Sequence, residues 1–150
     1  MLHLLATFFG TGRARIAPGT MTSLAAAALL LAPFGSRLHG IALGIMIVAS
    51  YIACVLVARS LFGSRVNDED PSWFTLDEAH GMWLAAWRPT PPTWAEIGIA
   101  FALFRFFDIV KPWPIRGIQS VRGGHGIVLD DTLAGAFALI LGLCLRTWIP

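Results

Sequence analysis

Most acidic side chains in this sequence fall into a few close groups. Two groups are adjacent pairs, Asp77-Glu78 and Asp130-Asp131; each pair precedes an apolar run typical of a helix, and the second follows a flexible glycine turn predicted at residues 123–126. Helix capping, which needs only one carboxylate, is the alternative interpretation of each pair. Adjacent carboxylates repel one another near apolar surroundings. The doubled acids therefore favour a bound cation, and an all-oxygen set favours Mg²⁺ over zinc.

A further acidic residue stands between two basic ones. Arg105, Asp108 and Lys111 are spaced three residues apart on a predicted helix that Pro112 ends, which places them on roughly one side of that helix. Such a set is either a ladder of salt bridges within the helix or a phosphate clamp beside a catalytic acid. The spacing is compatible with both interpretations.

A glycine- and hydroxyl-rich loop near the N-terminus is suited to an anion. The loop covers residues 17–23 and is predicted to open a helix, with Gly19, Thr20 and Ser23 near its first backbone amides, which attract phosphate. Ordinary capping by Thr20 or Thr22 is the alternative. The loop lacks the Gly-Lys-Ser/Thr of a P-loop, so we expect no nucleotide ligand.

The composition favours a membrane-associated protein. The 150 residues are 56% hydrophobic and 13% charged, with a mean hydropathy of +0.69, whereas an average soluble domain carries about 25% charged residues. The length predicts a single domain over residues 1–150. A net charge of +2 without a basic stripe excludes a nucleic-acid partner. Cys54 and Cys144 lie in apolar runs without metal or redox spacing and are predicted to pack.

Two apolar segments are long enough to cross a bilayer. Residues 38–58 are uncharged and match the ~20 residues of a spanning helix, and residues 132–149 can span if Arg146 snorkels to the surface. Eight basic residues lie on the side formed by segments 9–23, 59–78 and 105–131 and three on the other, so the positive-inside rule places the first side in the cytoplasm. A helical bundle that only docks on the membrane is the alternative.

Shorter apolar segments complete the predicted architecture. A helix is expected over residues 22–32, after Pro18 and Gly19 break its start. Region 79–104 is divided at 88–93 into two short pieces, predicted to form a hairpin that dips into the bilayer or lies in its interface. The predicted fold is therefore all-α, a compact multi-helical membrane-associated bundle with about four apolar segments.

Four ordered stretches across about residues 8–136 carry a resemblance to a known family. They read FGTGRARIAPGTMTS, DPSWFTLDEAHGMW, FRFFDIVKPWPI and GGHGIVLDDTLAG. In this order they resemble the phosphatidylglycerophosphatase A family. The resemblance implies an all-helical enzyme that removes the terminal phosphate of phosphatidylglycerophosphate with Mg²⁺ and yields phosphatidylglycerol. It also implies a place in the bacterial cytoplasmic (inner) membrane, with the active site facing the cytoplasm.

The motifs and the chemistry of their residues assign roles to individual positions. The expected ligands of one or two Mg²⁺ ions are Asp77, Glu78, Asp130 and Asp131. The expected catalytic residues are Asp77, Asp131 and Asp108, the last as general base or as nucleophile. The residues expected to bind the substrate phosphate are Gly19, Thr20, Ser23, Arg105 and Lys111. The sequence departs from the family pattern at His80, which is predicted either to tune the metal site or to pack.

Two other functions compete with this hypothesis. A non-catalytic membrane subunit or small transporter would carry carboxylates within its spans as an ion pathway, whereas here the acids are predicted at span ends. A phosphatidyl transferase would also use clustered aspartates and magnesium. It would need an Asp-Gly-x-x-Ala-Arg pattern, which the sequence lacks.

Overall fold

The computed structural model describes residues 1–31, 39–63, 71–118 and 124–146. Every regular element within these ranges is helical, so the all-α prediction is confirmed. Besides a single 3-10 turn, η1 at Thr11–Arg13, the elements are α1 Leu2–Ala6, α2 Pro18–Leu29, α3 His39–Phe62, α4 Leu76–Ala85, α5 Trp94–Val110, α6 Ile115–Ile118 and α7 Gly124–Arg146.

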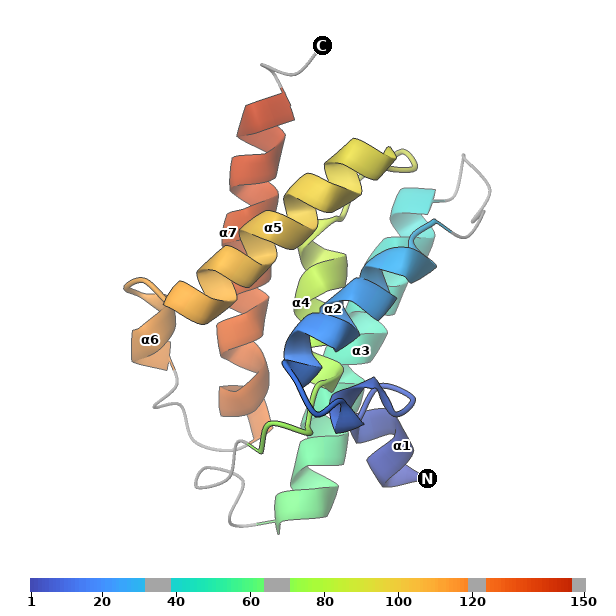
Figure 1. Ribbon diagram of the computed structural model, residues 1–150, viewed down its shortest axis with the longest axis vertical. Helices are drawn as coiled ribbons and strands as arrows, with labels where there is room; N and C mark the ends of the chain where they lie inside the picture. The colour runs from blue at the N-terminus through green and yellow to red at the C-terminus, as the bar shows by residue number, and fades with distance from the viewer. Residues whose placement is uncertain (32–38, 64–70, 119–123, 147–150) are drawn as a thin grey trace.

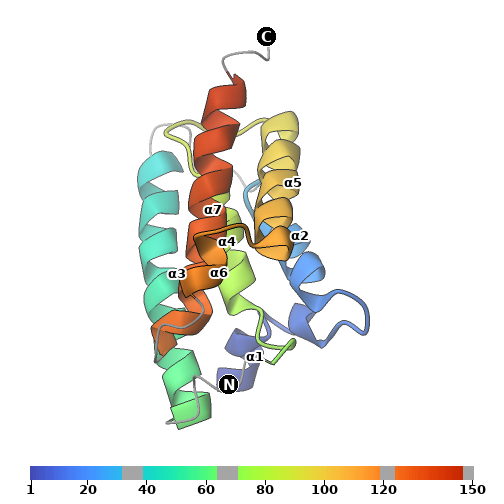
Figure 2. The same ribbon diagram turned by 90° about the vertical axis from the view of Figure 1, so that its left-hand side faces the viewer.

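Helix α4 is short and lies at the centre of the bundle. It packs against α2, α3, α5 and α7, which surround it in both ribbon views (Figures 1 and 2). Eight of its ten residues are buried, among them Asp77, His80 and Met82. A helix with contacts on every side must be filled by small or apolar residues, and any polar group on it must find a partner inside the protein. The acidic pair at the start of α4 is therefore held inside the bundle.

Glycines set the distance between α4 and α7. A Cβ built on Gly135 of α7 would lie 2.5 Å from the carbonyl oxygen of Gly81 on α4, and one built on Gly81 would lie 2.5 Å from the Phe104 ring of α5. Only glycine leaves room for such close contact between backbones. This contact sets the spacing between the acids of α4 and those of α7.

Helices α3 and α7 are the two helices, within the described residues, that are long and apolar enough to cross a membrane. The prediction of a span at 38–58 corresponds to α3. One face of α3 carries Ile41, Ile45, Val48, Ile52 and Leu56, each at least half exposed. Their spacing of three or four residues places them on a single stripe. An apolar stripe of this size on a protein surface marks a surface that contacts lipid or another protein.

The structure corrects two predicted helix starts. Helix α2 begins at Pro18, which occupies the first turn and does not break it, because the N–H that proline lacks has no helical partner at that position. Helix α7 begins at Gly124, so the described part of the predicted glycine turn is helical. Asp130 and Asp131 therefore lie in the second turn of α7 and not at its N-terminus. Packing against α4 and α5 outweighs the low helix propensity of glycine.

Other predicted boundaries agree with the structure. Region 79–104 forms two helices, α4 and α5, separated by a loop, and α5 ends at Val110, with Lys111 as its C-cap residue directly before Pro112. Glu96 and Thr93 form a capping box at the start of α5. A hairpin that dips into a bilayer stays a prediction. The end of the helix predicted over residues 22–32 lies outside the described residues.

Candidate active site

Three carboxylates from two helices converge in the interior. Asp77 and Glu78 come from the first turn of α4, and Asp131 comes from α7. Each of the three residues offers one carboxylate oxygen, and these oxygens all lie within 4.8 Å of one another. They line a cavity of about 260 Å³ together with Asp108, Lys111 and Asp130, and Pro71, Ser72 and Phe74 form part of its wall. The fold therefore brings together acids that are more than fifty positions apart in the sequence.

Burial makes this cluster electrostatically costly. Asp77 and Asp131 are only 5% and 4% exposed. Burial, and then the negative charges of Glu78 and Asp131, raises the pKa of Asp77 well above its ordinary value. Burial likewise raises the pKa of Glu78 to about 7. Glu78 Oε2 is buried without a hydrogen-bond partner among the described residues. These acids are short of positive charge and of donors.

The three acids fit a hard divalent cation. Their donor atoms are all carboxylate oxygens, and Mg²⁺ is commonly held by one or two carboxylates together with waters and phosphate oxygens. An unpartnered, buried Glu78 oxygen and a repulsive set of neighbours are the two conditions that such an ion would relieve. The residues that would hold it are Asp77, Glu78 and Asp131.

Two basic side chains stand beside the acidic cluster. Arg105 Nη1 lies 2.6 Å from Asp108 Oδ2, and Lys111 Nζ lies 3.9 Å from Asp108 Oδ1, so the salt-bridge ladder on α5 is present. Lys111 lines the cavity, whereas Arg105 is absent from its lining. Burial acts to lower the pKa of Lys111, but the hydrogen bond to Asp130 and nearby acids outweigh it and raise this pKa. Lys111 is thus a protonated ammonium at the edge of the cavity.

The second acidic doublet divides into two different environments. Asp130 Oδ2 accepts a hydrogen bond from Lys111 Nζ at 2.5 Å, whereas Asp131 belongs to the three-acid cluster. Consecutive helix residues point about 100° apart, so one member can face α5 while the other faces α4. Of the four predicted metal ligands, Asp77, Glu78 and Asp131 lie together, whereas Asp130 pairs with the Lys111 ammonium.

The predicted phosphate-binding residues of α2 are only in part near the cavity. Gly19 packs directly against Glu78, because a Cβ at this position would overlap with Glu78 Oε1. Ser23 is fully buried and its Oγ donates to the Gly19 carbonyl at 2.8 Å. Neither Thr20 nor Ser23 lines the cavity. Gly19 therefore shapes the site by allowing Glu78 to approach α2.

A chain of threonines, which no sequence motif predicted, positions α4. Thr11 and Thr22 share a hydrogen bond of 2.6 Å between their hydroxyls, and Thr22 Oγ1 donates to Thr75 Oγ1 at 2.8 Å. Thr75 is the N-cap residue of α4, and its backbone N–H donates to the Ala6 carbonyl. The chain links η1, α2 and α4 just ahead of the acidic pair. Its only signal in the sequence is the abundance of hydroxyls in the first and second motifs.

His80 is held by neighbours away from the acidic cluster. Its Nδ1 lies 2.9 Å from Ser50 Oγ on α3, and its Nε2 lies 3.1 Å from Thr132 Oγ1 on α7. Burial lowers the pKa of His80 to about 4, so the ring is neutral at physiological pH. Both ring nitrogens are used in linking α3, α4 and α7. This geometry favours the packing interpretation of His80.

The fold and the cavity define a class of protein, an all-helical protein with a buried carboxylate site beside a lysine. Comparison with known proteins makes the assignment specific. The family model of phosphatidylglycerophosphatase A matches residues 4–146. The chain therefore belongs to the phosphatidylglycerophosphatase A family, as the four motifs predicted, and it is an enzyme of the phosphatase class.

Named relatives support this membership over nearly the full length. The chain is 35% identical to phosphatidylglycerophosphatase A of Haemophilus influenzae, over 99% of this chain and 90% of the relative. It is 34% identical to the Escherichia coli protein of that name, over 91% and 78%. A Bacteroides thetaiotaomicron protein provisionally named phosphatidylinositol-3-phosphatase is 36% identical over 97% and 93%. No solved structure gives a significant match.

Proposed function

We propose that this enzyme hydrolyses the terminal phosphomonoester of phosphatidylglycerophosphate, with Mg²⁺ bound by Asp77, Glu78 and Asp131. The observation that carries the proposal is the meeting of these three acids with Lys111 in one cavity of about 260 Å³. The names of the Haemophilus influenzae and Escherichia coli relatives support the substrate. The products would be phosphatidylglycerol and inorganic phosphate.

The ion would supply charge that the chain lacks at this point. When bound, Mg²⁺ provides Lewis-acid stabilisation of a phosphoryl oxygen and helps to activate the attacking water. The protein contributes buried carboxylates already gathered for it, since Gly19 admits Glu78 and the Gly81–Gly135 contact sets the distance to Asp131.

The remaining polar residues would orient the phosphoryl group and move the proton. Lys111, held at the cavity edge by Asp130, is placed to neutralise a phosphoryl oxygen. Asp108 lines the same cavity and is our candidate either for the general base that accepts the proton of water or for the nucleophile. In the first role the water oxygen bonds to phosphorus while the bond from phosphorus to the glycerol oxygen breaks, and the proton that Asp108 has accepted passes to the glycerol oxygen, which leaves as the hydroxyl of phosphatidylglycerol. Arg105 would act through its 2.6 Å ion pair with Asp108.

The apolar surface supports a site at a membrane. The exposed stripe on α3, and the length of α3 and α7, fit helices whose outer faces contact acyl chains. The lipid substrate would keep its tails in the bilayer while its headgroup enters the cavity. The excess of basic residues on the segments beside the cavity favours the cytoplasmic face of a bacterial inner membrane.

Phosphate release from the purified chain tests the proposal. The substrates are phosphatidylglycerophosphate, phosphatidic acid, phosphatidylinositol 3-phosphate and a soluble phosphomonoester, each with Mg²⁺ or with EDTA. We expect the fastest release from phosphatidylglycerophosphate, and its loss in EDTA. The Asp131→Asn variant, purified in parallel, controls for contaminating phosphatases.

Other outcomes would redirect the assignment. Preference for phosphatidylinositol 3-phosphate would move the substrate to the one in the name of the Bacteroides thetaiotaomicron relative. Full activity in EDTA would remove the metal from the mechanism.

A further inference from the structure

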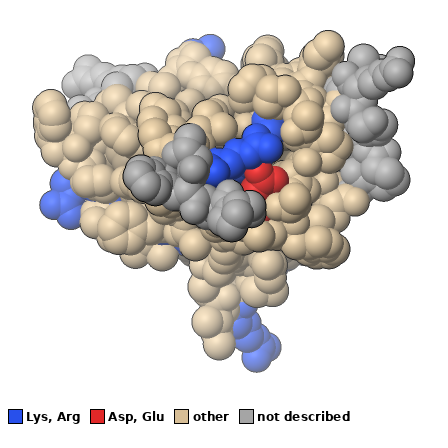
Figure 3. Space-filling model, turned by 90° about the horizontal axis from the view of Figure 1, so that it is seen from above, with Lys and Arg blue, Asp and Glu red and all other residues tan. Residues whose placement is uncertain are grey.

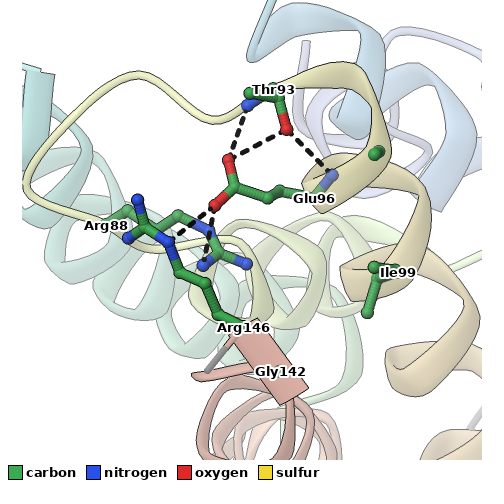
Figure 4. Close-up of a pocket in the computed structure, with 7 residues that line it drawn as sticks. Arg88, Thr93, Glu96, Ile99, Gly142 and Arg146 are labelled. Atoms are coloured by element: carbon green, nitrogen blue, oxygen red, sulfur yellow. Dashed lines mark hydrogen bonds and ion pairs between the residues drawn. The ribbon is translucent and has the colours of Figure 1, made fainter. Parts of the chain in front are cut away.

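A second polar pocket lies at the opposite end of α7. It is formed by Arg88 from the loop after α4, Glu96 from the first turn of α5 and Arg146 from the last turn of α7. Figure 4 shows the two arginines converging on the Glu96 carboxylate. The cavity has a volume of about 370 Å³. Fifteen residues of helix separate Arg146 from Asp131, or about 22 Å along α7, so this pocket is distinct from the acidic one.

The Glu96 carboxylate is fully used within this pocket. Its Oε2 accepts hydrogen bonds from Thr93 N at 2.8 Å and Thr93 Oγ1 at 3.0 Å. Its Oε1 faces Arg88 Nη1 at 3.4 Å and Arg146 Nε at 3.2 Å. Two guanidinium groups therefore share one oxygen of one carboxylate. The cluster carries one positive charge that its own acid does not neutralise.

Arg88 shows where that charge is least satisfied. Its side chain is 3% exposed, its Nε has no hydrogen-bond partner among the described residues, and its Nη1 has only the 3.4 Å ion pair with Glu96 and no hydrogen bond there. A buried guanidinium normally has its N–H groups paired, because an unpaired buried donor costs about 1 to 3 kcal/mol and more when charged. Arg88 lines the cavity, and so does Gly142 on α7, where a Cβ would lie 3.9 Å from Arg88 Nη2.

The surroundings indicate what kind of anion would fit. A guanidinium offers parallel N–H donors that match two oxygens of a phosphate. Arg146 lies in the last turn of α7, one of the two helices among the described residues that are long and apolar enough to span a bilayer. If α7 crosses a bilayer, Arg146 lies at the level of the lipid headgroups. Figure 3, which views this end of the molecule, shows basic and acidic atoms together on a mostly uncharged face.

We propose that Arg88 and Arg146 form a second anion site, which binds a phosphate group about 22 Å from the acidic cavity along α7. The phosphate belongs either to the headgroup of an anionic phospholipid or to a free phosphate ion, and both sources present the same oxygens. The site rests on the geometry of this pocket and does not depend on the proposed reaction.

Binding to variants of the full chain tests the site. Wild-type protein, Arg146→Gln and Glu96→Gln are compared in neutral detergent with EDTA, so that the acidic cavity holds no cation. The matched control is Arg59→Gln, which removes an exposed arginine from the last turn of α3. One arm uses native mass spectrometry to compare how many phosphatidylglycerol and phosphatidylcholine molecules stay bound to each protein. The other titrates inorganic phosphate and follows Tm.

The two pocket variants are expected to act in opposite directions. Arg146→Gln removes a charged donor and should weaken binding about tenfold, whereas Glu96→Gln removes the competing carboxylate and should tighten it. Arg59→Gln should match wild type. A lipid source gives preference for phosphatidylglycerol, and a free-ion source gives a Tm rise with phosphate alone. If Arg146→Gln does not fold, Glu96→Gln alone tests the site: tighter binding than wild type supports the proposal, and weaker or equal binding contradicts it.

Two results would overturn the proposal. One is equal binding by wild type, Arg146→Gln and Glu96→Gln in both arms. The other is binding that Lys111→Gln, the variant of the one basic residue among those described that lines the acidic cavity, abolishes and Arg146→Gln leaves intact, because the anion would then occupy the acidic cavity.

Discussion

The two ends of α7 carry pockets with opposite electrostatics. At the Asp131 end, three acids lie within 4.8 Å of one another and Glu78 Oε2 has no hydrogen-bond partner among the described residues. At the Arg146 end, both oxygens of Glu96 are taken by Thr93 and by two arginines. A carboxylate whose partners all come from its own chain has a structural role. Acids left without such partners are available to a ligand.

Replacing Asp131 should give the largest effect on activity. Asp131→Asn removes one of the three convergent carboxylates, and we expect phosphate release to fall about a hundredfold or more, because metal-assisted charge stabilisation is lost. Steady-state phosphate release measures the effect, and Asp77→Asn should behave alike. Membrane insertion and Tm should stay close to wild type. Wild-type activity in Asp131→Asn would remove this residue from the site.

A methyl group at Gly19 should disturb the acidic cavity without unfolding the chain. Gly19→Ala forces the Glu78 carboxylate, the mobile end of its side chain, away from α2, so we expect about tenfold lower activity and a higher Mg²⁺ requirement. A Mg²⁺ titration of phosphate release measures both. Gly98→Ala on α5, where a Cβ meets no atom within 4 Å, is the matched control. Equal kinetics in the two variants would contradict a role for Glu78.

Asp130 should resemble Glu96 more than its neighbour Asp131. Asp130→Asn removes the carboxylate that pairs with Lys111 but leaves the cluster of Asp77, Glu78 and Asp131 unchanged. We therefore expect activity to fall about fivefold. The Mg²⁺ requirement should not change. A loss as large as that of Asp131→Asn, together with a raised Mg²⁺ requirement, would return Asp130 to the metal ligands.

At the other end of α7, Glu96→Gln should affect stability. Partial burial acts to raise the pKa of Glu96, but hydrogen bonds from Thr93 and the charges of Arg88 and Arg146 outweigh it and lower this pKa. Because the folded pKa lies below the ordinary 4.5, the carboxylate stabilises the fold above pH 4.5 and loses this effect as the pH falls further. The variant should lose about 1 kcal/mol at pH 7 through the weakened capping box. Thermal melting of wild type and Glu96→Gln between pH 7 and pH 3 measures this effect. The difference in stability between the two proteins should shrink as the pH falls, and a constant difference would contradict a stabilising role for the charged carboxylate.

Much of the site was predictable from residue types and spacing. The pair Asp77-Glu78 was expected at a helix start and lies in the first turn of α4, since polar residues before an apolar run mark such a start. Lys111 and Asp108 were expected on one side of a helix that Pro112 ends, and they lie there. Local rules governed these features, because they depend on residues a few positions apart.

Long-range features could not be derived in this way. The difference between Asp130 and Asp131 depends on where α7 begins and on which helices its sides face. The meeting of Arg88, Glu96 and Arg146 joins residues up to 58 positions apart, and no local pattern links them.

The amino-acid sequence by itself determined that the chain is helical and apolar, that its acids come in pairs, and which family it belongs to. Only the tertiary structure decided which acids share a cavity and which are neutralised by their own chain. The physical reason is that hydrophobic periodicity fixes each helix separately. The electrostatic environment of a side chain depends on the helices packed around it, and here that packing depends on close contacts such as Gly81 with Gly135.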